Sequence, residues 1–206
     1  MDIKESMRQI IEAESRAVAA IPYSEAYDNA VELIIEHVHR RGGKLVTSGM
    51  GKAGQIAMNI ATTFASTGTP SINLHPSEAQ HGDLGMLQPN DIMLLISNSG
   101  KTREIVDLVG LTHRLYPDMP MIVITGHPES ELSQIPGVVT LATGCADEVC
   151  PLGLTPTTST TLMTVIGDVL VVNVMRLTGF TAAQYALRHH GGYLGQKSRI
   201  DAETNN

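Results

Sequence analysis

The chain has 206 residues, of which 42% are hydrophobic, 17% are charged and 3% are aromatic. This length and composition predict one globular domain with an aliphatic core and exclude a second large domain. The formal net charge of −7 at pH 7 argues against a protein that mainly binds nucleic acid or a membrane surface, so we expect neither partner. Any anionic ligand must then be held by local geometry.

Two features predict a cytoplasmic location. The chain shows neither the basic start and apolar block of a signal peptide nor any run of about 18 apolar residues. Its two cysteines, Cys145 and Cys150, are too few for a disulfide framework, and we expect both to be reduced thiols. Only the tail 201–206 is predicted to be disordered.

Two amphipathic helices are predicted at the start of the chain. Apolar residues recur at helical spacing from Ile3 to Ile11 and from Tyr27 to Val38, and Gly42 then offers a helix end. Apolar stripes of this kind pack in a core or in a subunit interface.

Short apolar runs punctuated by Gly, Ser and Pro follow, and each run predicts a strand. This alternation with helices predicts an α/β fold with a doubly wound sheet of about five mostly parallel strands. Ligands of such sheets bind beyond the carboxyl ends of the strands, so the loops at that edge form the candidate site. The predicted strands cover 45–47, 71–74, 91–96, 121–125 and 138–142, and the helices between and after them cover 55–67, 103–115 and 159–177.

The loop after the first predicted strand is a candidate phosphate site. Residues 48–54 lead directly into a helix, and Ser48, Gly49 and Lys52 supply a hydroxyl, a free backbone and a cation. The G-x-G-x-x-G spacing of this loop also fits a dinucleotide-binding protein. That alternative needs an acidic residue about 20 positions further on, where the chain has His75 and Pro76.

Two more hydroxyl-rich loops lie at the same predicted edge. One follows the third strand, and the other, 155–161, opens the last long helix and includes Thr158 and Ser159. These hydroxyls could simply cap the helices that they precede. Three such loops together favour a phosphorylated ligand. The loop after the third strand reads Ser97, Asn98, Ser99, Gly100, Lys101 and Thr102.

Titratable side chains accompany these loops. His75 and His81 could bind a substrate hydroxyl, share a metal ion or make structural hydrogen bonds. Glu104 could act on a ligand or only stabilise the dipole of its helix. Glu148 follows the fifth strand, and His189 stands near the C-terminus just before a flexible Gly-Gly pair.

One chemistry uses all of these groups. Interconversion of an aldose phosphate and a ketose phosphate moves a proton between C1 and C2 through an enediolate and needs no redox cofactor. A carboxylate can serve as the base, a cation can stabilise the oxyanion, and loops can hold the phosphate. The candidate proton carriers are His81, Glu104, Glu148 and His189, with Lys52 as the electrostatic partner.

These motifs resemble the sugar isomerase (SIS) domain family, and most closely its D-arabinose 5-phosphate isomerase branch. The resemblance implies a flavodoxin-like α/β/α sandwich, a single SIS domain over 1–200 and a homotetramer with active sites shared between subunits. It also implies reversible conversion of D-ribulose 5-phosphate to D-arabinose 5-phosphate, which feeds synthesis of the acid sugar Kdo of lipopolysaccharide or capsule. The resemblance spans residues 5–200 and rests on the blocks 48–54, 65–70, 75–86, 96–100, 150–161, 167–168 and 179–181.

The resemblance also implies roles for individual residues. Lys52, Glu104, Glu148 and His189 match positions that the family is thought to use in catalysis. No cofactor is required, although His75 matches a position where the family can bind zinc. The expected substrate-binding residues are Ser48, Gly49, Gly68, Thr69, His75, His81, Ser97, Asn98, Ser99, Gly100, Lys101, Thr102, Thr158, Ser159 and His190.

The sequence departs from the family pattern at three places. Lys101 stands where the family usually has Glu, His190 stands where it often has Pro, and the chain ends before the pair of CBS domains that many relatives carry. Lys101 leaves room for a more acidic ligand. One alternative function is therefore a binding or regulatory module for sugar phosphates or nucleotide-linked Kdo, with little catalysis. Another is an SIS isomerase for a different phosphosugar.

Overall fold

Five parallel strands form the centre of the structure, which is a computed structural model that describes residues 2–204. All neighbouring pairs are parallel, with Val46 opposite both Ile72 and Met93. The predicted α/β class is confirmed, and the strand order β2-β1-β3-β4-β5 is that of flavodoxin-like folds. The strands are β1 (Leu45–Gly49), β2 (Ser71–Asn73), β3 (Ile92–Ile96), β4 (Met121–Thr125) and β5 (Val139–Ala142).

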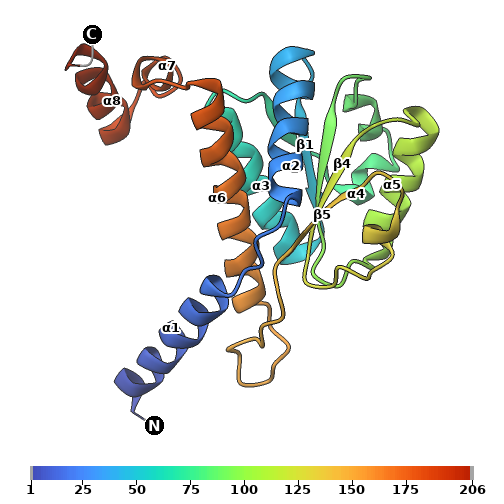
Figure 1. Cartoon of the computed structure of the whole chain (residues 1–206), viewed down its shortest axis with the longest axis vertical. Helices are drawn as coiled ribbons and strands as arrows, with labels where there is room; N and C mark the ends of the chain where they lie inside the picture. The colour runs from blue at the N-terminus through green and yellow to red at the C-terminus, as the bar shows by residue number, and fades with distance from the viewer. Residues whose placement is uncertain (1, 205–206) are drawn as a thin grey trace.

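Helices cover both faces of the sheet, which explains why the strands are continuous apolar runs (Figure 1). β1, β3 and β4 are buried over their whole length. Leu94 of β3 belongs to the core under α2 (Ala26–Ile34), α3 (Gly51–Ser66) and α6 (Thr158–Thr178). Its neighbour Leu95 points to the other face and belongs to the core under α5 (Arg103–Leu115).

Helices α3 and α6 pack against each other along their length. A methyl group added to Gly167 would lie 2.5 Å from Cγ1 of Ile60, so only glycine permits this approach. Both helices start at the carboxyl edge of the sheet and end at the amino edge, where Gly68 contacts the ring of Phe180. By length and composition α6 could also cross a membrane, a test that the core helix of a globular protein passes equally.

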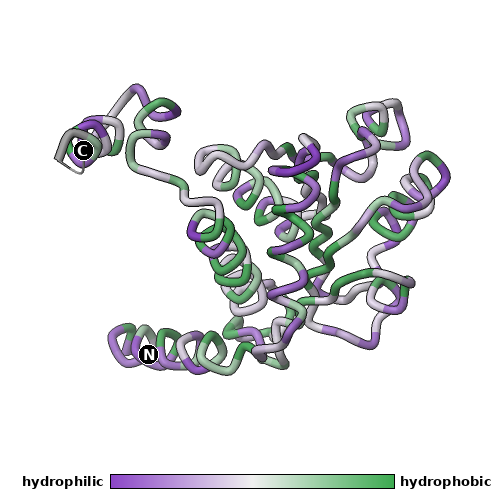
Figure 2. The backbone as a smooth tube through the Cα atoms, turned by 45° about the horizontal axis from the view of Figure 1, so that its top comes forward, coloured by the Kyte–Doolittle hydropathy of each residue, from purple (hydrophilic) through white to green (hydrophobic). Residues whose placement is uncertain are grey.

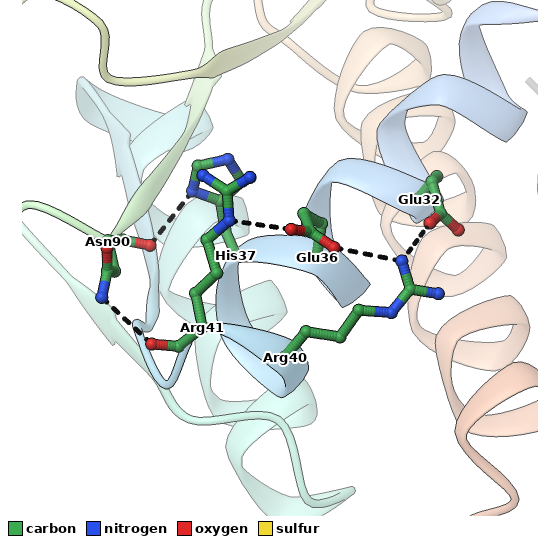
Figure 3. A network of polar contacts seen from close by, with 6 residues as sticks. All are labelled: Glu32, Glu36, His37, Arg40, Arg41 and Asn90. Carbon is green, nitrogen blue, oxygen red and sulfur yellow. Dashed lines mark hydrogen bonds and ion pairs between the residues drawn. The ribbon is translucent and has the colours of Figure 1, made fainter.

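The second predicted helix is interrupted, because α2 continues into the π-helix η1 (Ile35–Arg40). A polar network holds η1 against the turn before β3 (Figure 3). Arg40 Nη1 lies 2.5 Å from Glu32 Oε1 and 3.1 Å from Glu36 Oε2. His37 Nδ1 lies 3.2 Å from the carbonyl oxygen of Asn90.

Both ends of the chain stand away from the sheet (Figures 1 and 2). α1 (Ile3–Ala19) buries none of its residues, and the exposed fractions of Ile3 and Met7 are 75% and 57%. The expected disorder of 201–206 is wrong for residues 201–204, which are helical, whereas 205–206 lie outside the described residues. The structure also contains elements that were not predicted, namely α4 (Pro76–Ala79), η2 (Asp83–Met86), η3 (Leu132–Gln134), α7 (Ala182–Ala186) and α8 (Gly192–Thr204).

Candidate active site

A cleft of about 290 Å³ lies beyond the carboxyl ends of β1 and β3. The strand order reverses between these two strands, and ligands of open parallel sheets bind at such a point. The cleft brings together predicted residues from all three hydroxyl-rich loops. They are Lys52, Ser97, Asn98, Ser99, Thr102 and Ser159.

The first of these loops is a tight turn from β1 into α3. Gly51 has a φ of +57°, which favours glycine. A methyl group on Gly49 would lie 2.8 Å from the backbone of Ala53, so the helix begins directly against the strand end. Ser48 is fully buried and its hydroxyl donates to the carbonyl oxygen of Leu74 at 2.6 Å, so it lies outside the cleft. Lys52, which follows the turn, lines the cleft.

The second loop, residues 97–102, is called the serine loop below. Its hydroxyls hold it in shape, because Ser97 Oγ lies 2.8 Å from Thr102 Oγ1 and accepts a hydrogen bond from the Gly100 amide at 3.1 Å. Gly100 has a φ of +60°, and a methyl group there would overlap the side chain of Ser130. Lys101 is exposed and does not line the cleft. The loop therefore presents preformed donors at the N-terminus of α5, which suit an anion.

Glu148 does not itself line the cleft, but its carboxylate binds residues at the start of α6, where Ser159 does line it. Its Oε2 atom accepts hydrogen bonds from the Thr157 amide at 2.6 Å, the Thr157 hydroxyl at 2.9 Å and the Ser159 amide at 3.3 Å. Burial raises the pKa of Glu148, but hydrogen bonds from Ser159 and Thr157 outweigh it and hold the pKa below its ordinary value. Glu148 is therefore ionised at neutral pH. All three of these hydrogen bonds are made to the same oxygen, Oε2.

Three other predicted residues of this edge do not line the cleft. Glu104 is half-buried in the first turn of α5, and His75 and His81 are exposed in the segment after β2. Among the residues that the structure describes, no three His, Cys, Asp or Glu side chains gather to hold a metal ion. Within one chain, the described residues around His75 therefore supply no complete set of zinc ligands.

The remaining predicted residues lie at the opposite, amino edge. Thr69 is buried there, with its hydroxyl 3.0 Å from Nε2 of His39. His189 lies beyond the end of α6 and stacks on Tyr185 with ring centroids 3.7 Å apart, next to the exposed His190. The 21 residues of α6 separate this group from Glu148 by about 30 Å. One chain thus holds the predicted catalytic residues in two separate groups.

His127 lines the cleft, and we did not select it from the sequence. It follows β4 at the carboxyl edge. Because ligands bind beyond the carboxyl ends of parallel strands, its position after the fourth predicted strand would have identified it. Thr158 is buried and accepts a hydrogen bond from the Val149 amide at 3.2 Å, so it supports the loop rather than the cleft.

A larger hollow lies elsewhere. It has a volume of about 710 Å³ and lies among the end of α1, α2 and α6, where Ile21, Val165 and Leu177 line it. Two carboxylates and no Lys or Arg line it, so it does not suit a sugar phosphate. The hydroxyl of Tyr27 in its wall is the one buried side-chain polar atom without a hydrogen-bond partner in the described part of the chain.

Comparison with known proteins identifies a family and several relatives. Residues 37–173 match the family model of the SIS domain. The arabinose 5-phosphate isomerase KdsD of Shigella flexneri is 44% identical over 196 residues, and the KdsD of Escherichia coli K12 is 43% identical. Each match covers 95% of this chain and 58% of the relative. The chain therefore spans somewhat more than half the length of these curated relatives.

Solved structures agree with this similarity. A putative phosphosugar isomerase involved in capsule formation from Bacteroides fragilis has a TM-score of 0.91 and 64% identity, covering 93% of this chain and 99% of that one. The E. coli CFT073 protein c3406, in complex with arabinose 5-phosphate, has a TM-score of 0.83 and 35% identity, covering 91% and 97%.

Proposed function

The chain belongs to the SIS domain family, and on that premise we propose that it is an isomerase that interconverts D-ribulose 5-phosphate and D-arabinose 5-phosphate. The observation that carries the proposal is the cleft between β1 and β3, which Lys52 and residues of the serine loop line and beside which Glu148 binds the start of α6. Identity of 44% and 43% to two arabinose 5-phosphate isomerases supports this substrate. The reaction needs no cofactor.

In this proposal the phosphate rests on the serine loop and the N-termini of α3 and α5. The hydroxyls of Ser99 and Thr102 and the nearby amides replace its hydration shell. Lys52 stabilises the negative charge that develops on the enediolate oxygen. The chain holds these donors in place before the substrate binds, so little reorganisation is needed during the reaction.

Glu148 is the proposed base. Three hydrogen bonds fix Oε2, and the carboxylate takes the proton from C2 of the aldose and returns it to C1. The proton of the C2 hydroxyl passes to the oxygen on C1 in the same conversion. The base is ionised at neutral pH, although its lowered pKa makes it a weak one, and Lys52 must therefore stabilise the enediolate. The direct test is exchange of the C2 proton of D-arabinose 5-phosphate in heavy water. No exchange with the wild-type protein would overturn the proposal.

We further propose a homotetramer in which His189, Gly68 and Thr69 of one copy complete the cleft of another. The separation of about 30 Å along α6 supports this arrangement, because the two groups cannot meet within one chain. The larger hollow, the unpartnered hydroxyl of Tyr27 and the exposed apolar side chains of α1 offer surfaces for such contacts.

The product would supply Kdo for capsule or lipopolysaccharide in the cytoplasm. The likeness to a Bacteroides fragilis protein described as involved in capsule formation supports the first use, and the free thiols of Cys145 and Cys150 fit a reducing compartment. Zinc has no part in this proposal.

Lys101 favours a second function, the binding of nucleotide-linked Kdo as a regulatory end product. Its ammonium group is exposed beside the serine loop and could meet an additional anionic group. Thermal shifts with pentose phosphates, Kdo and nucleotide-linked Kdo separate the two functions. Strong stabilisation by the acidic sugars without turnover of D-ribulose 5-phosphate would favour the binding module. A coupled assay with other aldose phosphates would reveal an isomerase for a different substrate.

A further inference from the structure

A second hollow adjoins the cleft at the carboxyl edge of the sheet. It has a volume of about 350 Å³ and lies beyond β4 and β5, where Thr143 and Asp147 line it. Asn98, His127 and Ser159 line both hollows. His127 therefore stands at the boundary between them.

The backbone around His127 is fixed against the serine loop. The carbonyl oxygen of Asn98 accepts hydrogen bonds from the Gly126 amide at 3.1 Å and from the Thr125 hydroxyl at 3.1 Å. The His127 amide in turn donates to Thr125 Oγ1 at 3.1 Å. A methyl group on Gly126 would lie 2.5 Å from Oδ1 of Asn98, so a larger residue there would displace the Asn98 side chain. The position of His127 is thus tied to the loop that would hold the phosphate.

The imidazole of His127 has one nitrogen engaged and one free. Nδ1 lies 2.8 Å from the carbonyl oxygen of Asn98, and because a carbonyl only accepts, Nδ1 carries the proton. In the neutral ring Nε2 is then a hydrogen-bond acceptor, and it has no partner among residues 2–204. His127 is exposed, so a ligand can reach this nitrogen.

The two hollows offer opposite hydrogen-bonding chemistry. The first is lined by donors, which are the Lys52 ammonium and the hydroxyls and amides of the serine loop. The second adds two acceptors, Nε2 of His127 and the carboxylate of Asp147. Such a pair fits a molecule with an anionic group at one end and hydroxyl groups along the rest. The two acceptors in the second hollow would repel a second anionic group that lay beyond His127.

We infer that His127 determines specificity by accepting a hydrogen bond from a hydroxyl of a neutral polyhydroxy chain whose phosphate lies on the serine loop. The position of the phosphate rests on the proposed function. The role of His127 rests on its own geometry at the boundary of the two hollows.

The experiment compares three variants. His127→Ala removes the acceptor, and His127→Gln keeps a side-chain carbonyl that can accept. His37→Ala is the matched control, because Nδ1 of His37 also binds a backbone carbonyl, that of Asn90, but at the opposite edge of the sheet (Figure 3). With D-ribulose 5-phosphate we expect H127A to raise KM by about threefold to tenfold, as for one lost hydrogen bond, and H127Q to restore most of it.

Inorganic phosphate tests whether His127 acts on the sugar or on the phosphate. It fills only the serine loop, so its inhibition constant should be the same in H127A and in the wild type. A KM in H127A equal to that in H37A would overturn the inference. So would a phosphate inhibition constant that rises as much as KM, since His127 would then only shape the serine loop.

Turnover by the wild-type protein tests the proposed function separately. If the wild type does not turn over D-ribulose 5-phosphate, the proposed function fails. H127A and H37A are then compared by the dissociation constant of D-arabinose 5-phosphate, measured by calorimetry. A weaker constant in H127A with an unchanged one in H37A would support the inference. An unchanged constant in H127A would overturn it.

Discussion

Glu148 combines a structural and a chemical task in one carboxylate. Its Oε2 atom accepts hydrogen bonds from the first amides of α6, and the same carboxylate is the proposed base. We expect Glu148→Gln to lower kcat by at least about 100-fold, because a general base contributes about 10² to 10⁴ in rate. Turnover of D-ribulose 5-phosphate measures this effect, with Glu129→Gln, an exposed carboxylate, as the control. Equal turnover in both variants would rule out Glu148 as the base.

The same substitution should also change how stability depends on pH. Hydrogen bonds hold the pKa of Glu148 in the folded protein below its ordinary value. The carboxylate therefore contributes stability that is fully present above the unfolded-state pKa of about 4.3 and is lost as the pH falls through the folded-state pKa. The difference in Tm between wild type and E148Q should be widest near pH 7 and should close as the pH falls through the folded-state pKa of Glu148.

Cys150 lies close to Glu148 in the chain and is an unusual thiol. Hydrogen bonds from the Thr155 hydroxyl and from the amides of Leu152, Thr155 and Leu154 lower the pKa of Cys150 to about 6. We expect its alkylation by iodoacetamide to reach half of its maximal rate near pH 6, as followed by mass spectrometry of the peptide. Thr155→Val should move this midpoint to higher pH, and Cys150→Ser should abolish the low-pH reaction. A midpoint unchanged by Thr155→Val would contradict this account.

The sequence predicted the chemical type of the site better than the exact residues. Hydroxyl and glycine spacing selected Lys52 and the serine loop, of which Ser97, Asn98, Ser99 and Thr102 line the cleft and Lys101 does not. In the sequence, Ser48 resembles the other serines that follow predicted strands. Its hydroxyl, however, binds the buried carbonyl of Leu74, and only the pairing of β1 with β2 sets that direction. His127 carries no motif of its own, and only its place just after the fourth strand marks it as a residue of this edge.

At the scale of elements, the contact of α3 with α6 depends on one glycine. Gly167→Ala would place a methyl group 2.5 Å from Ile60, and we expect a loss of about 1–3 kcal/mol in the free energy of unfolding from overpacking. Gly110→Ala is the matched control, since this glycine lies in α5 with open space around it and should gain up to about 1 kcal/mol. Urea unfolding measures both. A stabilised G167A would show that α6 shifts freely.

Strand positions were predictable because burial on both faces leaves a continuous apolar signal. The predicted range 121–125 equals β4, and the other strands differ from their predicted ranges by one or two residues. The π-helix η1 was not predictable, because its apolar residues continue the spacing of α2. α7 and α8 bury few side chains, so they carry no clear apolar period.

At the scale of the whole molecule, the separated groups at the two edges predict complementation. E148Q and His189→Ala should each be inactive. Mixed oligomers made by co-expression should recover activity at roughly a quarter of the sites, by random pairing of chains. A mixture of E148Q with Lys52→Ala, which damages the same edge, should recover none. Recovery in neither mixture would mean that each chain works alone.

The span of α6 also links activity to the amount of protein in the cell. A working site is proposed to need the carboxyl edge of one chain and the amino edge of another. Below the dissociation constant of the assembly, the concentration of complete sites would then fall more steeply than the concentration of chains. Specific activity per chain would then rise with expression. Each cell would make the sugar phosphate in quantity only above a threshold abundance of this protein, without any additional regulator.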